Sequence, residues 1–409
     1  MPVIPIVLLL SALFAAPAPP AGTAHVRESD GATLTLATSP ARIPLDLRGN
    51  HLYFRGRIND SDSLWMVLDS GASVNAVDAG VARAIGLETD GGGHAQGAGG
   101  KVEVQRVREA TIHLPGATLA GAPITAMPLD AFKRQTGRAM EVIVGQPLFD
   151  RGVVRIDYVG RTMELLPAEG WEYTGKGVVL PLSFEQRLPY IKAKVTLPGR
   201  DPVEGRFVID LGSTQALILT PTFAEKVKAV EAFPKTIEAR GRGVGGQVPS
   251  RVGRVARLEV GGVGFEQVVT AIPASTQHHV GAGDAIGNIG GEILRRFVVT
   301  FDYARKRMIL EPNAKLGDPF EADMSGLGMK MGPEGSGTLQ VDWIQSPSPA
   351  AEAGIKADDL IEQVDGRPAI EVGVPGLREM FRRAGETHRF RVRRGDERLE
   401  ISFTTRRLI

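Results

Sequence analysis

One arrangement of residues occurs twice in this chain, and it constrains the fold more than any other feature. An apolar run leads into Asp69-Ser70-Gly71, and a second apolar run leads into Asp210-Leu211-Gly212. Asp and Gly are poor strand residues, so each run should be a strand that ends in a tight turn carrying a carboxylate. Asp157-Tyr158 recurs as Asp302-Tyr303 at nearly the same offset. A near-constant offset over such a length indicates an internal duplication, and we expect two similar lobes.

The segments between these landmarks follow the same order in both halves. Asp78 is placed to cap a short helix in the first half, and Thr220 with Pro221 opens one in the second. Each helix is followed by a Gly-rich tract and by an apolar strand ending in Gly. We therefore divide the chain into a signal peptide (1–24), a polar leader (25–48), lobe 1 (49–167), lobe 2 (168–315) and a C-terminal module (322–409), with 166–177 as the connection between the lobes.

The composition favours a β-rich protein without a nucleic-acid ligand. The chain has 409 residues, enough for two or three domains, and its 50 glycines cluster around hairpin-like segments. A net charge of +1 provides no attraction for a phosphate backbone, and aromatic residues amount to only 6%. We expect no nucleic-acid partner.

The N-terminus is typical of a secretory signal. Residues 3–16 are apolar, and a Pro-rich segment and small residues lead to a cleavage site near Ala24. This predicts a periplasmic or secreted protein. No basic residue precedes Arg27, so an uncleaved membrane anchor is the alternative. The chain has no Cys, which excludes disulfides, thiolate metal sites and a lipid-modified Cys.

Each lobe resembles a retropepsin-like aspartic protease unit of the bacterial secreted type. That family combines an apolar strand into D-T/S-G, a Gly-rich flap hairpin and a later apolar-apolar-Gly strand, here Ile143-Val144-Gly145 and Asn288-Ile289-Gly290. The resemblance covers about residues 50–312. It implies a mainly β fold in which two acid-protease β-barrel lobes form a pseudo-dimer within a monomer. It further implies catalytic residues Asp69 and Asp210, supporting residues Ser70, Gly71, Gly212 and Ser213, and flap residues Gly97, Gly99, Gly100, Gly243, Gly245 and Gly246.

The chemistry of this family requires two carboxylates. Two such groups held close together share one proton, so the ionised one activates a water and the protonated one polarises the scissile carbonyl. The resemblance thus implies a peptide-hydrolysing endopeptidase acting on peptide or protein substrates, with no cofactor and no metal.

Lobe 2 departs from the family at one position. Ser70 keeps a hydroxyl that can brace the two Asp turns against each other, but Leu211 cannot donate, so the brace is at most one-sided. The Ser213 hydroxyl is placed to bond the outer oxygen of Asp210. The alternative function is a catalytically inactive peptide-binding protein of the cell envelope, which a wide separation of the carboxylates, or Leu211 between them, would indicate.

Other motifs support no competing chemistry. Residues 241–246 match G-x-G-x-x-G, but no helix follows, so a dinucleotide site is improbable. His278 and His279 are adjacent and lack a metal-binding spacing. No G-x-S-x-G motif indicates a serine hydrolase.

The C-terminal module resembles a PDZ domain of the bacterial protease-associated type. Gly326-Leu327-Gly328-Met329 matches its carboxylate-binding loop, and 348–355 matches its S-P-A-x-x-A-G segment. The resemblance implies that C-terminal peptides add as a strand in a groove. The groove residues would be Leu327, Gly328, Met329, Leu377 and Phe381. The alternative is a packing module without a free ligand.

Overall fold

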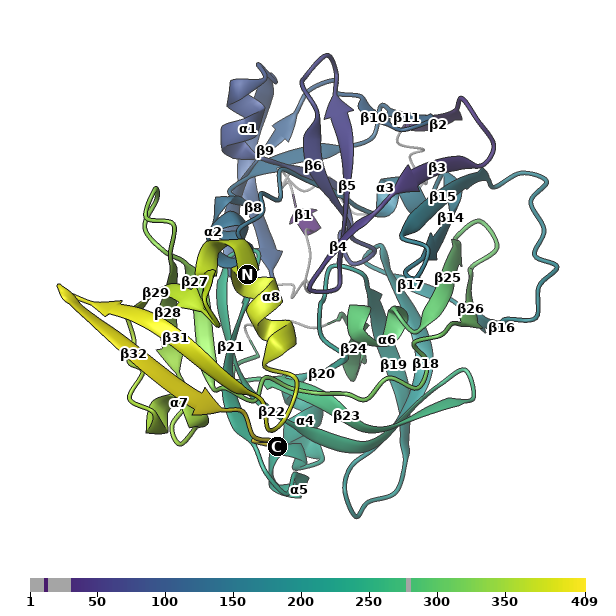
Figure 1. The fold of residues 1–409 in the computed structure, drawn as a ribbon. Coiled ribbons are helices and arrows are strands. Elements are labelled where there is room, and N and C mark those ends of the chain that lie inside the picture. Colours follow the sequence, from purple (N-terminus) through teal and green to yellow (C-terminus); the bar gives the residue numbers. More distant parts are fainter. Residues whose placement is uncertain (1–10, 14–30, 277–280) are drawn as a thin grey trace.

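The structure is a computed structural model that describes residues 11–13, 31–276 and 281–409. It is mainly β, with two lobes facing each other and a C-terminal module at their side (Figure 1). Most of the predicted signal peptide and the His278-His279 pair lie outside the described residues. Residues 11–13 form a short strand, β1 (Ser11–Leu13), paired with β8 (Thr89–Gly97). No helix in the described ranges is long and apolar enough to cross a membrane.

The helices and strands fall into three groups along the chain. Lobe 1 contains β2 (Thr33–Leu36), β3 (Ala41–Pro44), β4 (Asp46–Arg48), β5 (His51–Ile58), β6 (Leu64–Leu68), β7 (Asn75–Asp78), α1 (Ala79–Ala84), β8, β9 (Gly100–Val107), β10 (Ile112–Leu114), β11 (Ala117–Ala120), β12 (Ile124–Met127), α2 (Asp130–Thr136), β13 (Val142–Val144), α3 (Gln146–Phe149), β14 (Gly152–Asp157) and β15 (Thr162–Pro167). Lobe 2 contains β16 (Val178–Pro181), β17 (Ser183–Glu185), β18 (Leu188–Thr196), β19 (Val203–Asp210), β20 (Leu217–Leu219), α4 (Pro221–Lys226), α5 (Ala229–Ala232), β21 (Ile237–Gly243), β22 (Gly246–Val260), β23 (Val263–Pro273), β24 (Gly287–Gly290), α6 (Gly291–Leu294), β25 (Phe297–Asp302) and β26 (Arg307–Pro312). The module contains β27 (Leu327–Met331), β28 (Leu339–Ile344), α7 (Pro349–Glu352), β29 (Leu360–Val364), β30 (Arg367–Pro368), α8 (Ala369–Met380), β31 (Thr387–Arg394) and β32 (Glu397–Thr404).

Strand pairing confirms that the two lobes repeat one topology. In lobe 1, β6 runs parallel to β13, which is antiparallel to β7, and β7 is parallel to β12. In lobe 2, β19, β24, β20 and β23 follow the same order with the same directions. Val67 pairs with Ile143 in the first lobe as Val208 pairs with Asn288 in the second. The repeated landmarks in the sequence therefore occupy equivalent places in the two lobes.

A six-stranded sheet joins the lobes. Its order is β16-β26-β25-β14-β15-β3, so three strands come from each half of the chain. The central pair, β14 and β25, places Ile156 opposite Val299, and both are fully buried. Burial of alternate residues explains the period-two pattern seen in the sequence, and the shared sheet fixes one lobe against the other.

The prediction that residues 25–48 form a leader outside the lobes is wrong for residues 33–48. β2 pairs with β11, β3 with β15 and β4 with β5, so residues 33–48 belong to lobe 1 and to the joining sheet. Ala41 and Ile43 are fully buried, while Arg42 between them is exposed. These strands are short, and two of the three pair with segments distant in the sequence, which a local pattern does not reveal.

The C-terminal module has its own sheet, in the order β27-β28-β29-β31-β32, and its own apolar core. β27 lies at the edge of this sheet, and α2 of lobe 1 packs against it. A Cβ atom at Gly137 would lie 2.9 Å from the sulfur of Met331. The module is therefore docked on the lobes.

Candidate active site

Asp69 and Asp210 lie together where the two lobes meet. Asp69 follows β6 and Asp210 ends β19, and their exposed fractions are 2% and 0%. The two carboxyl groups lie close enough together for each to affect the pKa of the other. A Cβ atom at Gly212 would overlap the Asp69 carboxylate, so only glycine permits this close approach. The structure thus brings together two acids that are 141 positions apart in the sequence.

Asp210 is held by three donors. The backbone N–H groups of Gly212 and Ser213 donate to its Oδ1 at 2.9 and 3.0 Å, and the Asn288 side-chain amide donates to its Oδ2 at 2.6 Å. The bond from Ser213 comes from its backbone N–H, where the sequence suggested the hydroxyl. The turn geometry aims successive N–H groups at the carboxylate, so no hydroxyl is needed there.

Burial raises the pKa of both acids, but to different extents. Burial raises the pKa of Asp210 to about 6. Its hydrogen bonds, led by that from Asn288, limit this rise because they favour the ionised form. The pKa of Asp69 rises well above its ordinary value, because burial and the neighbouring Asp210 charge act in the same direction. Asp69 accepts a bond from the Gly71 N–H at 2.9 Å. The two acids therefore titrate as a coupled pair, and the three donors on Asp210 favour its ionised form.

Ser70 supplies the brace between the turns, from one side only, as the sequence predicted. Its hydroxyl donates to the Ile209 carbonyl at 2.8 Å and accepts from the Leu211 N–H at 3.0 Å. Leu211 itself is fully buried in the apolar core. It is also absent from the lining of the cavity beside Asp69. The missing hydroxyl has thus been replaced by core packing, and Leu211 does not separate the two carboxyl groups.

The two Gly-rich tracts form hairpin tips that touch each other. The tips lie between β8 and β9 in lobe 1 and between β21 and β22 in lobe 2. The Gly99 N–H donates to the Val244 carbonyl at 2.8 Å. A Cβ atom at Gly97 would overlap Val244, and one at Gly99 would overlap the backbone of Gly246. A Cβ atom at Gly245 would overlap the backbone of Gly100. A Cβ atom at Gly243 would likewise overlap the methyl group of Ala98. Glycine is therefore required where the tips meet.

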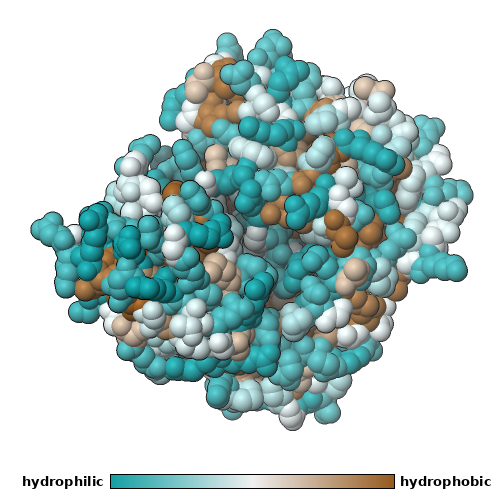
Figure 2. Space-filling view, in the orientation of Figure 1, coloured by the Kyte–Doolittle hydropathy of each residue, from teal (hydrophilic) through white to brown (hydrophobic). Residues whose placement is uncertain are grey.

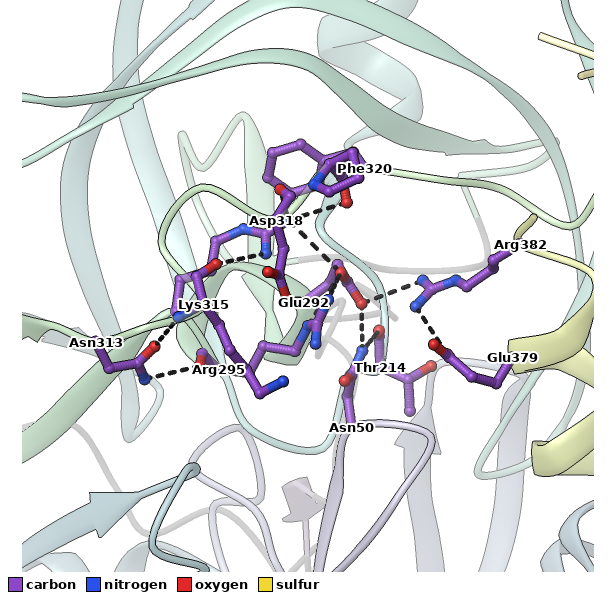
Figure 3. Close-up of polar contacts among 12 residues, drawn as sticks. Asn50, Thr214, Glu292, Arg295, Asn313, Lys315, Asp318, Phe320, Glu379 and Arg382 are labelled. Atoms are coloured by element: carbon purple, nitrogen blue, oxygen red, sulfur yellow. Dashed lines mark hydrogen bonds and ion pairs between the residues drawn. The ribbon is translucent and has the colours of Figure 1, made fainter. Parts of the chain in front are cut away.

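Sequence reasoning missed two residues that cross from lobe 1 to the second Asp turn. Asn50 donates from its amide to the Thr214 carbonyl at 2.9 Å and to Glu292 at 2.8 Å (Figure 3). His51 donates through Nε2 to the Gly212 carbonyl at 3.2 Å. Burial lowers the pKa of His51 to about 4, so it is neutral with the proton on Nε2 near neutral pH. Both are single polar residues in a hairpin, and no local motif distinguishes them.

Asp69 borders a cavity of about 1060 Å³ that reaches all three parts of the chain. Its lining includes Asp69, the flap residues Ala98 and Val244, and residues of the C-terminal module. The face drawn in Figure 2 is mainly hydrophilic and is hollowed between the module and the lobes. The volume of this cleft lies at the upper end of the range found for ligand-binding pockets.

The predicted groove residues of the module lie in its core or beside the same cleft. Leu377 and Phe381 are fully buried, and Met329 is 3% exposed. Leu327 and Gly328 line the cavity, but the Leu327 N–H already donates to the Ser325 hydroxyl at 3.0 Å. α2 of lobe 1 packs against β27, the strand beside which a peptide would add. Use of the groove for C-terminal peptides stays a prediction.

No group of three or more potential metal ligands occurs in the described part of the chain. Residues 54–148 and 193–289 each match a family model described as aspartyl protease. No curated protein matches the chain. The first matched segment carries Asp69 and the second carries Asp210, each with its later apolar strand. The chain is therefore similar to aspartyl proteases over two separate segments, which together form a pair of retropepsin-like lobes around one carboxylate pair.

Proposed function

We propose that this protein is an aspartic endopeptidase whose water nucleophile is activated by the Asp69–Asp210 pair. The observation that carries the proposal is the close approach of two buried carboxyl groups whose hydrogen bonds differ. Asp210 accepts three bonds, from Gly212, Ser213 and Asn288, and these favour its ionised form. Asp69 is the protonated member. The pair thus contains one base and one acid at the same pH, as peptide hydrolysis requires.

The reaction follows from this division of roles. Asp210 removes a proton from a water molecule as the water attacks the scissile carbonyl carbon, and Asp69 donates its proton to the carbonyl oxygen. The resulting tetrahedral diol then loses a hydroxyl proton back to Asp69, while Asp210 passes its proton to the leaving nitrogen. The C–N bond breaks, and both acids return to their starting states. The touching flap tips exclude bulk water during these steps.

The functional test is digestion of a peptide library by the wild type and by Asp69→Asn side by side. Cleavage by the wild type alone supports the proposal. Failure of the wild type to cleave, with peptides still bound, would favour the alternative of a non-catalytic peptide-binding protein. That alternative draws its support from Leu211, which removes one of the two hydroxyls expected at the turns.

Specific activity should be independent of concentration, because both acids lie in one chain. The measurement is activity over a thousand-fold dilution, together with mixing of Asp69→Asn and Asp210→Asn proteins. Activity lost on dilution or restored on mixing would mean that the site forms between chains. Periplasmic or secreted location stays a prediction from residues 1–24.

A further inference from the structure

The C-terminal module forms one wall of the catalytic cleft. Arg378 of α8, Trp343 of β28 and Gly328 of β27 line the same cavity as Asp69. A substrate that reaches the carboxylate pair on this side therefore passes the module. This placement is independent of the groove predicted between β27 and α8.

Polar contacts hold the module in this position. Arg382 forms an ion pair with Glu292 of lobe 2 at 3.1 Å, and the same carboxylate accepts from Asn50 of lobe 1 (Figure 3). On the other side, the Glu238 N–H of the second flap hairpin donates to the Gln345 side chain at 3.0 Å. The wall is thus fixed to both lobes and to one flap, so its side chains have defined positions relative to Asp69.

The carboxylates around this cleft are mostly neutralised by the protein itself. Glu292 pairs with Arg382 and Arg295, Glu238 pairs with Arg251, and Glu321 pairs with Arg254. Within the described residues, five lining cations have no ion pair. They are Arg161, Arg240, Arg242, Lys315 and Arg378. The cleft therefore carries an excess of positive charge that the chain does not balance.

Arg378 is the most informative of these cations. Its charge contributes to the lowered pKa of His51, which bonds Gly212 beside Asp69. Its side chain is exposed to solvent where it lines the cleft. The carboxylate that acts on it most is Asp323, but no ion pair forms between them within the described residues.

Only one oxygen of Asp323 is engaged elsewhere, and its buried Oδ2 has no hydrogen-bond partner among the described residues. Its Oδ1 accepts from the Ser325 N–H, the Ser325 hydroxyl and the Gly326 N–H. Burial raises the pKa of this acid, which weakens it further as a counter-ion. A guanidinium that lines a cleft without an ion-pair partner is available for strong bidentate bonds with a ligand carboxylate.

We propose that Arg378, supported by Arg240 and Arg242 of the second flap hairpin, binds a carboxylate of the peptide substrate in the catalytic cleft. The enzyme would then select substrates with a negative charge on the side of the scissile bond that faces the module. The carboxylate is either the C-terminus of the substrate or an acidic side chain. This inference rests on the proposed function, because it names the substrate class of the same site.

The test uses Arg378→Gln in the full-length protein, with Arg367→Gln as the control. Arg367 is an exposed arginine of the same module, away from the cleft. Fluorogenic peptides are compared as free acids and C-terminal amides, and with Glu or Gln near the cleavage site. Loss of one charge-assisted bond predicts a KM about 10-fold higher for the preferred charged peptides, with an unchanged kcat. Uncharged peptides and the control variant should show no change.

The two arms identify the source of the carboxylate. An effect confined to free acids assigns the site to the C-terminus of the substrate, and one confined to Glu peptides assigns it to a side chain. An equal effect of Arg378→Gln on charged and uncharged peptides would overturn the inference.

Binding of the same peptides to Asp69→Asn and to Asp69→Asn/Arg378→Gln, measured by fluorescence anisotropy, separates this inference from the proposed function. Charge-dependent binding without any cleavage by the wild type would refute the endopeptidase and keep the carboxylate site. Cleavage without charge preference would keep the endopeptidase and refute the carboxylate site.

Discussion

The two Asp turns lie on equivalent strands, yet each is held by a different device. Lobe 1 has Ser70 in its turn and the apolar Ile143 on the neighbouring strand, while lobe 2 has Leu211 and Asn288 at the equivalent places. Each lobe therefore contributes one polar group, from a different position. The hydroxyl of lobe 1 braces the turns, and the amide of lobe 2 binds a carboxylate.

This difference teaches that a duplicated site can divide its tasks between the copies. In a symmetric pair the two acids have the same surroundings, and the shared proton has no preferred position. Here Asn288 favours the ionised form of Asp210, and nothing equivalent acts from Ile143 on Asp69. This asymmetry favours Asp210 as the ionised member of the pair before any substrate binds.

The largest expected effect comes from removing either acid. Asp69→Asn and Asp210→Asn should each lower kcat by about 10³-fold or more, because the pair works as one acid–base unit. The double variant should be little worse than either single one. Steady-state assays on one peptide measure all three, with the exposed Asp201→Asn as the control. Full activity in Asp210→Asn would reduce that residue to a turn residue and end the comparison.

Much of the Asp69–Asp210 site could be predicted from the sequence, because its signals are local and occur twice. The strand before each Asp, the glycines after it, the Asp78 cap and the Gly-rich flap tips all depend on neighbouring residues. Repetition then distinguished a site from a chance motif. The polar Asn288 in an otherwise apolar triplet was a usable signal, but its role was not inferred.

The rest depends on contacts between distant segments. His51 and Asn50 meet residues more than 160 positions away, and no pattern around them indicates those partners. Residues 33–48 form strands whose partners mostly come much later in the chain. The docking of the module is likewise decided by single side chains such as Arg382. Such pairings require the folded chain.

The flap tips provide the second test, because they join the two lobes above the acids. Gly99→Val should lower kcat/KM by about 100-fold, since a side chain there would push Gly246 and the opposite tip away. The control is Gly92→Val in the same hairpin, where an added Cβ meets no atom within 4 Å. We expect little change in the melting temperature of either variant. Equal kinetics in both would mean that tip contact has no role in turnover.

Asn288→Ile makes lobe 2 resemble lobe 1 at this position and tests the division of roles. The wild type should give a bell-shaped pH profile of kcat/KM, with its acid limb near pH 6 as Asp210 becomes protonated and its basic limb at higher pH as Asp69 loses its proton. Without the amide donor the pKa of Asp210 rises, so the acid limb moves to higher pH. Activity below pH 6 should fall by about 10-fold.

An acid limb that stays in place in Asn288→Ile would show that Asn288 only fills space. A matched control is Asn75→Ser in lobe 1, since Asn75 accepts from the Gly145 N–H and donates to the Pro123 carbonyl, and neither partner is one of the two acids. That variant should leave the acid limb unchanged even if it lowers the overall rate.

The smallest effect on activity is expected from exchanging the residues of the brace. Ser70→Ala removes a buried hydroxyl that serves the Ile209 carbonyl and the Leu211 N–H, so it should cost about 2 kcal/mol in the free energy of unfolding and a few-fold in kcat. Leu211→Thr adds the hydroxyl that lobe 2 lacks, but it also removes apolar volume from a fully buried site. The two contributions nearly cancel, so stability should change by less than about 1 kcal/mol and activity by less than about three-fold.

Urea unfolding and steady-state kinetics on both variants measure these changes. A rise in activity of ten-fold or more in Leu211→Thr would contradict the one-sided brace, because it would mean that the native pair of turns is too loosely held. A neutral result would instead indicate that one hydroxyl, the shared sheet and the Asn50 and His51 contacts already fix the two acids.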